Sequence, residues 1–512
     1  MSLRHIMVFY YCAAIYLAAS TAAIAQQFQP DTELQQLYQR LDSAERRIRE
    51  LEHESTSNFQ RPIVATPASS SRNTFQSGDA SELGDRVNQL EQQWERLTSS
   101  DEKKKKEAAT KPSLKWTGRI HADYWGFMDD SPGIGFFEHP DPTAANFGTD
   151  PEDRFAFRRL RLGLHGDVLE TMFYKLEVDF NNTDDPEYKD IFIGWKELPF
   201  NQSVILGNQK RPLGLDHLNS SRYNVFMERP LVVEAFNEDA RRVGMAAYGY
   251  TDDERYNWRY GVYTLENSTR DGRVVGDSLQ WSGNVRLASS PWYDETSDGR
   301  GYFHWAVSGM FARPDGDAFA ADTNSNEGRF RTRMEARSDQ RWLNTDRIAG
   351  ITAYEIMGIE AMLNVGPVQV VHEYQFNWSQ RENDTDLFFH GAYVFVSYFL
   401  TGEFQPYDRQ RGIIGRVKPY ENFFLVDRCR GGRGWGMGAW QIAARYSYLD
   451  LSDENILGGV GRNLTLGLNW FWTPYSKIQF NYIYGDIENH APVNTFTSGN
   501  YHIFGTRFMV DF

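Results

Sequence analysis

The stretch Leu464-Thr-Leu-Gly-Leu-Asn-Trp-Phe-Trp472 alternates apolar residues with small or amide ones. Successive side chains of an extended chain point to opposite sides, so the stretch predicts a β-strand with one apolar and one polar face. Residues 476–485, 367–378 and 114–125 repeat this pattern, with aromatic residues near the ends of the apolar faces. A soluble sandwich would show the same local alternation. The length, number and aromatic ends of the strands favour strands that face lipid.

Sixteen such segments follow one another from residue 113 to the C-terminus. They cover residues 114–125, 154–166, 172–180, 188–196, 203–209, 241–250, 257–265, 279–288, 301–312, 352–363, 367–378, 388–400, 436–448, 462–472, 476–485 and 501–512. The pattern predicts an all-β fold, a sixteen-stranded antiparallel transmembrane β-barrel over residues 113–512 with a water-filled lumen. An even strand number puts both ends of this domain in the periplasm, together with the short links 364–367 and 473–476. The link 401–435 is also periplasmic in this topology and is unusually long.

The N-terminus predicts export. Arg4 and His5 precede the apolar run Ile6–Ala19, and Ala23-Ile-Ala25 offers a cleavage site. Residues 1–25 are therefore expected to be a signal peptide; an uncleaved anchor is the alternative, but the run is shorter than the ~18–20 residues of a spanning helix. The mature chain keeps one cysteine, Cys429, so neither an intrachain disulfide nor a cysteine metal cluster can form.

Residues 26–112 predict a periplasmic α-helical coiled-coil arm with a linker. Apolar residues recur at alternating spacings of three and four, a heptad seam, at Leu34, Leu37, Leu41, Ala44, Ile48 and Leu51. A shorter seam runs from Leu83 to Leu97, and the Ser- and Pro-rich segment Ser55–Ala80 separates the two. A lone amphipathic helix packing on its own domain is the alternative. Short coiled coils are marginal alone, so the arm suggests an oligomer.

The charge of the chain argues against a nucleic-acid partner. The formal net charge is −15, whereas nucleic-acid-binding surfaces are basic. Residues 1–112 carry 14 basic and 15 acidic residues of the 54 and 69 in the chain, which leaves 40 and 54 in residues 113–512. No hydrolase or phosphate-loop motif occurs and the eleven histidines show no ligand spacing, so neither an enzyme nor a cofactor is expected.

A run of arginines, Gly328-Arg-Phe-Arg-Thr-Arg-Met-Glu-Ala-Arg337, carries the functional prediction. In an extended chain Arg329, Arg331, Arg333 and Arg337 would project to one side, about 7 Å apart. Counting the run as a wall strand would give seventeen strands, so we place it in the connection 313–351, at the extracellular end and free to fold inward. The alternative is a solvated edge strand, the commoner role of a charge run. Residues 210–240 are the candidate for a second loop that narrows the lumen.

The chain ends in Phe508-Met-Val-Asp-Phe512. Phe508, Val510 and Phe512 share one face of the last predicted strand. We interpret them as the signal that the outer-membrane insertion machinery reads.

Several blocks of the sequence resemble the phosphate-selective porin O and P family. They are Asp153–Gly163, Tyr174–Asp179, Leu206–Gln209, Met227–Arg229, Ala240–Gly244, Ser397–Glu403 and Gly438–Ser447. The resemblance spans residues 114–512 and implies a trimeric outer-membrane channel of sixteen strands. Some members also carry an N-terminal coiled-coil arm.

In phosphate-selective members of the family, an arginine ladder in the lumen leads anions to a narrow site formed by inward-folded loops. The run 329–337 matches the spacing of that ladder, and Arg158 and Arg159 match paired arginines on an early strand. Arg119 and Arg241 or Arg242 are looser matches. The resemblance therefore implies passive diffusion of phosphate or related small anions, in a homotrimer surrounded by outer-membrane lipid. The acidic residues Glu177, Asp179 and Glu373 are also expected in the lumen, where they could orient the arginines or make the pore unselective. The alternative function is a general, non-selective porin whose arm contacts the cell wall and tethers the outer membrane to it.

Overall fold

The structure is a computed structural model that describes residues 112–128, 130–182, 184, 186–237, 240–267, 279–316, 326–427 and 432–512. The predicted signal peptide, residues 1–25, lies outside the described residues. So does the predicted coiled-coil arm, except for its last residue, 112. Both stay predictions.

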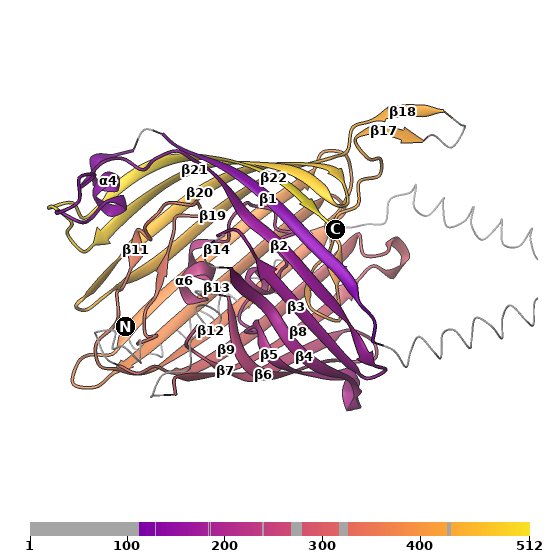
Figure 1. Ribbon diagram of the computed structural model, residues 1–512, viewed down its shortest axis with the longest axis horizontal. Helices are drawn as coiled ribbons and strands as arrows, with labels where there is room; N and C mark the ends of the chain where they lie inside the picture. Colours follow the sequence, from indigo (N-terminus) through magenta and orange to yellow (C-terminus); the bar gives the residue numbers. More distant parts are fainter. Residues whose placement is uncertain are drawn as a thin grey trace, which may run out of the picture. The chain divides into compact units, whose positions relative to one another are not determined.

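Within the described residues, sixteen antiparallel strands close into one barrel (Figure 1). They are β1 (Lys115–Met128), β2 (Arg154–Leu169), β3 (Met172–Asp179), β4 (Glu187–Leu198), β5 (Gln202–Lys210), β6 (Arg241–Tyr250), β7 (Tyr256–Thr264), β8 (Trp281–Tyr293), β9 (Gly301–Arg313), β12 (Ile351–Val365), β13 (Val368–Arg381), β14 (Leu387–Phe399), β19 (Ala439–Asp453), β20 (Ile456–Thr473), β21 (Ser476–His490) and β22 (Gly499–Asp511). Each strand pairs with its neighbour along the barrel, and β22 pairs with β1 to close it. The predicted strand order is confirmed, and each of the sixteen predicted segments overlaps one barrel strand.

Apolar side chains lie on the outer face of each strand and polar ones on the inner face, as the period-two pattern predicts. On β20, Leu464 and Leu466 are 46% and 48% exposed on the outer surface, whereas Thr465 between them is fully buried on the inside. Aromatic side chains gather on the same outer surface, where the ring centroids of Trp440 and Trp470 lie 4.8 Å apart. This belt of exposed apolar side chains suits a wall that faces lipid.

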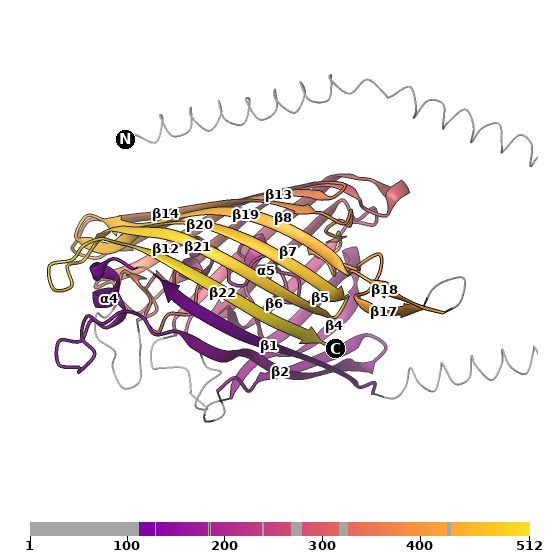
Figure 2. The ribbon, with the colours of Figure 1, turned by 90° about the horizontal axis from the view of Figure 1, so that it is seen from above.

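The two ends of the barrel differ. One end, hereafter the short-turn end, carries the C-terminus and tight turns such as residues 170–171, 366–367 and 474–475 (Figure 2). The connection 400–438 is the exception at this end. The other end, hereafter the long-loop end, carries the longer connections of residues 129–153, 211–240 and 314–350. The sequence predicts that the short-turn end is periplasmic.

Three connections carry short elements of their own. Residues 129–153 contain the helix α4 (Pro132–Glu138), and residues 211–240 contain α5 (Leu215–Leu218) and α6 (Leu231–Phe236). Residues 314–350 contain the hairpin β10 (Arg331–Thr332) and β11 (Leu343–Asn344). Two 3₁₀ turns, η2 (Pro199–Asn201) and η3 (Glu295–Ser297), lie at the short-turn end. No helix among the described residues is long and apolar enough to cross a membrane.

The connection 400–438 contains two hairpins. The first pairs β15 (Tyr407–Asp408) with β16 (Ile413–Ile414), and the second pairs β17 (Phe424–Asp427) with β18 (Arg433–Gly436). The second hairpin projects away from the barrel (Figures 1 and 2). The first folds into the lumen, where Tyr407 contacts His304 of β9 at 2.8 Å and Gly412 accepts a hydrogen bond from Arg286 of β8.

The lumen is therefore filled in part by chain from both ends. From the long-loop end, α6 packs against β10 and against the wall strands β14 and β19. Phe330, which precedes β10, packs edge-on against Phe236 of α6 and against Tyr354 of β12. The prediction that residues 210–240 and 313–351 fold inward is confirmed for their described parts.

The prediction that residues 329–337 form one continuous extended segment, with the four arginines on one side, was wrong. Only Arg331 and Thr332 form a strand, and the chain bends at Glu335, whose φ of 60° lies in the left-handed region. The side chains that alternate with the arginines are nevertheless all buried: Phe330, Thr332, Met334 and Ala336. The carboxylate of Glu335 explains the bend: it reaches Arg445 of β19 and accepts a hydrogen bond from Thr465 of β20 at 2.8 Å.

Candidate functional site: a basic cavity in the lumen

A cavity of about 680 Å³ lies inside the barrel between β1–β7 and the inward-folded connections. Residues 218–229 close it from the long-loop end, and residues 410–413 of the first hairpin border it from the short-turn end. Its lining includes the basic residues Arg119, Arg159, Arg161, Lys175, Lys196, Lys210, Arg222, Arg229, Arg241, Arg259 and Arg411, against the acidic residues Asp190 and Glu197. This excess of cations contrasts with the net negative charge of the chain, and it concentrates positive potential where a solute would pass.

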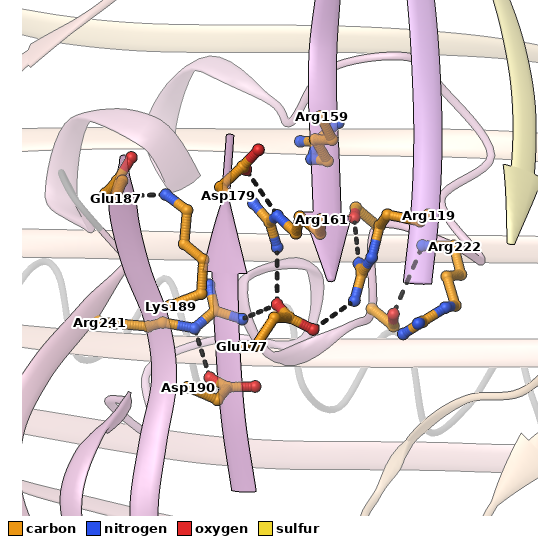
Figure 3. Close-up of polar contacts among 12 residues, drawn as sticks. Arg119, Arg159, Arg161, Glu177, Asp179, Glu187, Lys189, Asp190, Arg222 and Arg241 are labelled. Carbon is orange, nitrogen blue, oxygen red and sulfur yellow. Dashed lines mark hydrogen bonds and ion pairs between the residues drawn. The ribbon is translucent and has the colours of Figure 1, made fainter. Parts of the chain in front are cut away.

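The cations of the wall are held in place by a second layer of carboxylates. Glu177 of β3 is buried, and it receives Arg119 at 3.0 Å, Arg161 at 3.2 Å and Arg241 at 3.8 Å (Figure 3). Arg161 also donates from Nε to Asp179 at 2.6 Å. These pairs fix the guanidinium groups in place. They do not cancel all of the positive charge, because four cations, Arg119, Arg161, Arg241 and Lys175, share the three carboxylates of Glu177, Asp179 and Asp190.

Arg119 and Arg222 tie the wall to the loop that closes the cavity. Arg119 of β1 donates to the hydroxyl of Ser221 at 2.8 Å. Arg222 donates in turn to the hydroxyl of Thr117 on β1 at 2.7 Å, and it forms an ion pair with Asp511 of β22 at 2.9 Å. The loop therefore presents its own arginine to the cavity at a fixed position.

A β-bulge turns both members of the predicted arginine pair toward the lumen. His121 of β1 pairs with Arg159 and Ala122 pairs with Phe157, so Arg158 is the extra residue of β2. A bulge re-aims the side chain that it adds. Phe157 is exposed on the outer surface, whereas Arg158 meets the inner loop and Arg159 lines the cavity. Two successive arginines can thus face inward on one strand.

Arg159 lies buried without a charged partner in the described part of the chain. Its Nη1 contacts the ring of His121 at 3.2 Å, and its Nε has no hydrogen-bond partner within the described residues. A buried guanidinium is costly unless an acceptor satisfies it. A bound anion would supply both the acceptor and the opposite charge.

Toward the long-loop end, a second group of arginines surrounds Glu228. Arg158 donates to this carboxylate from Nε at 2.8 Å and from Nη2 at 3.1 Å, a two-point contact, and Arg507 of β22 donates to it at 2.6 Å. Arg337 lies beside the group; burial, followed by the neighbouring guanidiniums of Arg158 and Arg333, lowers the pKa of Arg337. Asp123 of β1 also pairs with Arg507 at 2.6 Å, so two carboxylates offset part of the positive charge of the group.

The structure separates the predicted arginines into two sets. Arg119 and Arg159 line the cavity, and Arg158 lies next to it on the same bulge. Arg329, Arg331, Arg333 and Arg337 all lie half-buried in the connection 314–350, outside the lining of the cavity, and Arg333 is paired with Glu234 of α6 at 3.6 Å. Arg242 is buried on β6 and donates to the backbone oxygen of Leu265 at 2.5 Å. It also stands outside the cavity lining.

The predicted acidic residues do face the lumen. Glu177 and Asp179 orient the wall cations, as described above. Glu373 of β13 instead holds a loop: its carboxylate accepts from the backbone amides of Leu215 at 3.0 Å and Asp216 at 2.7 Å. This fixes the start of α5, and with it the loop that closes the cavity.

Sequence reasoning missed several cations of the site. Arg161 and Lys175 could have been found from the period-two pattern, since Arg161 follows Arg159 by two residues and Lys175 precedes Glu177 by two. Arg222, Arg229 and Arg411 lie in irregular connections. No periodic signal places such residues in the lumen.

The comparison with protein families settles the class. A family model described as phosphate-selective porin O and P matches residues 139–512, more than half of the chain. The chain belongs to this family. It is an outer-membrane porin, and the family and the barrel fold together point to a channel rather than an enzyme.

Relatives and solved structures of this porin class are distant. An uncharacterized protein of Caulobacter vibrioides is 26% identical over 367 residues, which are 69% of this chain and 68% of the relative. Among solved structures, the anion-selective porin from Comamonas acidovorans is 11% identical with a TM-score of 0.46, and the alignment covers 78% of this chain and 100% of that one. The channel DcaP of Acinetobacter baumannii is 10% identical with a TM-score of 0.45, covering 78% and 98% of the two chains. A trimer form of OmpT of Vibrio cholerae is 10% identical with a TM-score of 0.44, covering 78% and 99%.

Proposed function

We propose that this porin lets phosphate or related small anions diffuse passively across the outer membrane, through the basic cavity. The observation that carries the proposal is the lining of the cavity, with eleven basic residues against two acidic ones among the described residues. Guanidinium groups stay charged and offer a fork of donors that fits phosphate oxygens. A row of several weak anion-binding sites lets an anion both enter the channel and leave it.

The path begins at the long-loop end, where the group around Glu228 and the arginines of residues 329–337 collect anions. It continues past Arg159, whose partner would be the passing anion, to the cavity wall of Arg119, Arg161 and Arg241. The carboxylates behind this wall keep the guanidiniums pointing into the lumen and lower the affinity, so that the anion is released.

Competition between phosphate and chloride tests this proposal. In planar bilayers with chloride as the main anion, added phosphate is expected to reduce the chloride current, because both anions use the same arginines. Arg159→Gln is expected to weaken this block, whereas Arg313→Gln, at an exposed arginine on the outer surface of β9, is expected to leave it unchanged. A chloride current that phosphate does not reduce would contradict phosphate as a solute.

Two further features belong to the proposal. The exposed apolar belt suits outer-membrane lipid and the neighbouring subunits of a homotrimer. Residues 508–511 end β22 and Phe512 follows it; Phe508 and Phe512 are exposed on the outer surface with Val510 between them, an arrangement that suits an insertion signal.

The second candidate function is a non-selective porin that also tethers the membrane to the cell wall through the predicted arm. Deleting residues 26–112 while keeping the predicted signal peptide separates the two roles. A channel alone keeps its conductance and the cells keep an intact envelope. A tether is indicated if the truncated protein conducts normally but the envelope becomes leaky.

A further inference from the structure

The basic cavity also has an apolar side. Phe173 of β3, Phe192 of β4 and Ile205 of β5 line it, next to the cations of β1–β3. We propose that the preferred solute is an organic anion, an acid group on an aromatic or other apolar body, rather than an inorganic anion of the same charge. This inference rests on the proposed function, since it names the class of anion that the same cavity accepts.

The two rings are built into the wall. Phe173 pairs with Gly194 across β3 and β4, and a Cβ atom on Gly194 would come within 2.4 Å of the Phe173 ring. The glycine therefore allows the ring to lie against the barrel wall. Phe192 meets Phe173 edge to face, with ring centroids 6.2 Å apart and planes at 83°. Gly194 pairs on its other side with Ile205, which completes a continuous apolar patch.

The patch stands directly beside the cations. Lys175 pairs with Phe192 across β3 and β4, and its ammonium group contacts Asp190 of the same hairpin. Arg161 and Arg241 reach the carboxylate of Glu177, two residues further along β3. An acid group bound to these cations would thus hold an attached ring against Phe173 and Phe192.

The patch is not needed to fill space. A second cavity, of about 420 Å³, lies next to the first and is also lined by Phe173 and Phe192. Both rings therefore border open volume on two sides, and apolar surface left facing water is unfavourable. An apolar body on the solute would cover it. The volume of about 680 Å³ falls in the range of sites that enclose whole organic molecules, and far exceeds what one inorganic phosphate fills.

Phosphate and phenyl phosphate form the matched pair of probes, because they share the acid group and differ by the ring. The full-length protein in planar bilayers carries a chloride current, and each probe is titrated at a pH at which both are mainly doubly charged. We expect phenyl phosphate to block half of the current at about one tenth of the phosphate concentration, because ring contacts of this kind are worth about a factor of ten.

Variants of the apolar patch test whether it causes the difference in block between phenyl phosphate and phosphate. Phe192→Ala and, separately, Phe173→Ala are expected to remove most of the preference for phenyl phosphate while leaving the block by phosphate unchanged. Phe311→Ala removes an aromatic side chain from the outer surface of β9, and it is expected to retain the full preference. A variant that no longer forms channels is replaced by the corresponding leucine variant, which keeps apolar bulk but loses the ring, and the same loss of preference is expected.

The outcomes separate the inference from the proposed function. Equal block by both probes in the unmodified protein overturns the organic-anion inference and leaves the anion channel intact. A preference that survives both phenylalanine variants overturns it as well. If neither probe blocks and the channel prefers cations, the proposed function itself fails.

Discussion

The backbone amide of Ile414 donates a hydrogen bond to the side-chain oxygen of Asn219 at 3.1 Å, inside the barrel. The two residues belong to connections that come from opposite ends, residues 400–438 from the short-turn end and residues 211–240 from the long-loop end. Two further hydrogen bonds fix the first hairpin, β15–β16, to the wall strand β7. Arg259 donates to the backbone oxygen of Arg411 at 2.6 Å, and Asn257 donates to that of Arg409 at 3.1 Å. These contacts occupy the centre of the lumen, and the basic cavity lies on the side that β1–β7 line.

Replacing residues 406–415 with a short glycine-serine linker is expected to raise the single-channel conductance, because the hairpin would no longer fill part of the lumen. The same change removes Arg409 and Arg411, so the preference for anions is expected to fall. Single-channel recording measures both quantities. Shortening the second hairpin of the same connection, residues 424–436, is the matched control, since that hairpin projects away from the barrel. Equal conductance in the two variants would contradict the placement of the first hairpin.

Glu373→Ala is expected to loosen the loop that closes the cavity. Its side chain accepts two backbone hydrogen bonds at the start of α5, and losing buried hydrogen bonds of this kind costs about 2 kcal/mol. We expect larger and noisier single-channel currents, as the loop leaves its position in a fraction of the channels. Glu355→Ala, on the neighbouring strand β12 and in contact with Gln380, is expected to give currents like those of the unmodified protein. Steady, unchanged currents in Glu373→Ala would show that other contacts hold the loop.

Arg161→Gln is expected to lower the ratio of anion to cation permeability. The change removes one positive charge from the cavity wall and leaves Asp179 and Glu177 with fewer cationic partners. A unit charge about 7 Å from the path changes the energy of an ion by about 2 kcal/mol at an effective dielectric constant of 20, before screening by salt. The shift of the reversal potential in a salt gradient measures the effect, with Arg313→Gln as the control. A permeability ratio that does not change would mean that Arg161 lies off the path.

Glu228→Gln is expected to change selectivity in the opposite direction. The substitution removes the negative charge shared by Arg158 and Arg507, so the anion preference should rise. It also leaves the guanidinium of Arg158 without its carboxylate, whereas Arg507 keeps Asp123, and this loss is expected to cost up to about 3 kcal/mol of stability. Reversal potentials and the thermal unfolding temperature in detergent test the two parts. If Glu228→Gln and Arg161→Gln shifted the reversal potential in the same direction, the claim that the charges of both residues act on the passing ion would be wrong.

The barrel could be predicted from the sequence because its wall follows one simple rule. Each strand must turn apolar side chains to lipid and polar ones to the lumen, so the period-two pattern of stretches such as residues 464–472 identifies the strands and their faces together. The same rule places Arg119 and Arg159 in the lumen. It does not predict the bulge at Arg158, because a bulge breaks the alternation on which the rule depends.

The interior of the lumen was only partly predictable. The strand count placed the arginine run in the connection 313–351 rather than in the wall, but the conformation of such connections depends on single contacts. The bend at Glu335 forms because Arg445 and Thr465, more than a hundred residues away, receive its carboxylate. Likewise Arg222 lies in the cavity because Thr117 and Asp511 hold it there. Contacts of this kind leave no local pattern in the sequence.

The reversal potential of the unmodified protein tests the central claim, that the cations of the lumen govern what passes. The full-length protein is placed in a planar bilayer between two concentrations of potassium chloride, and the potential at zero current is read. A potential near the chloride equilibrium value, reduced by Arg161→Gln and unaffected by Arg313→Gln, is the result that we predict. A potential near the potassium equilibrium value would contradict the account.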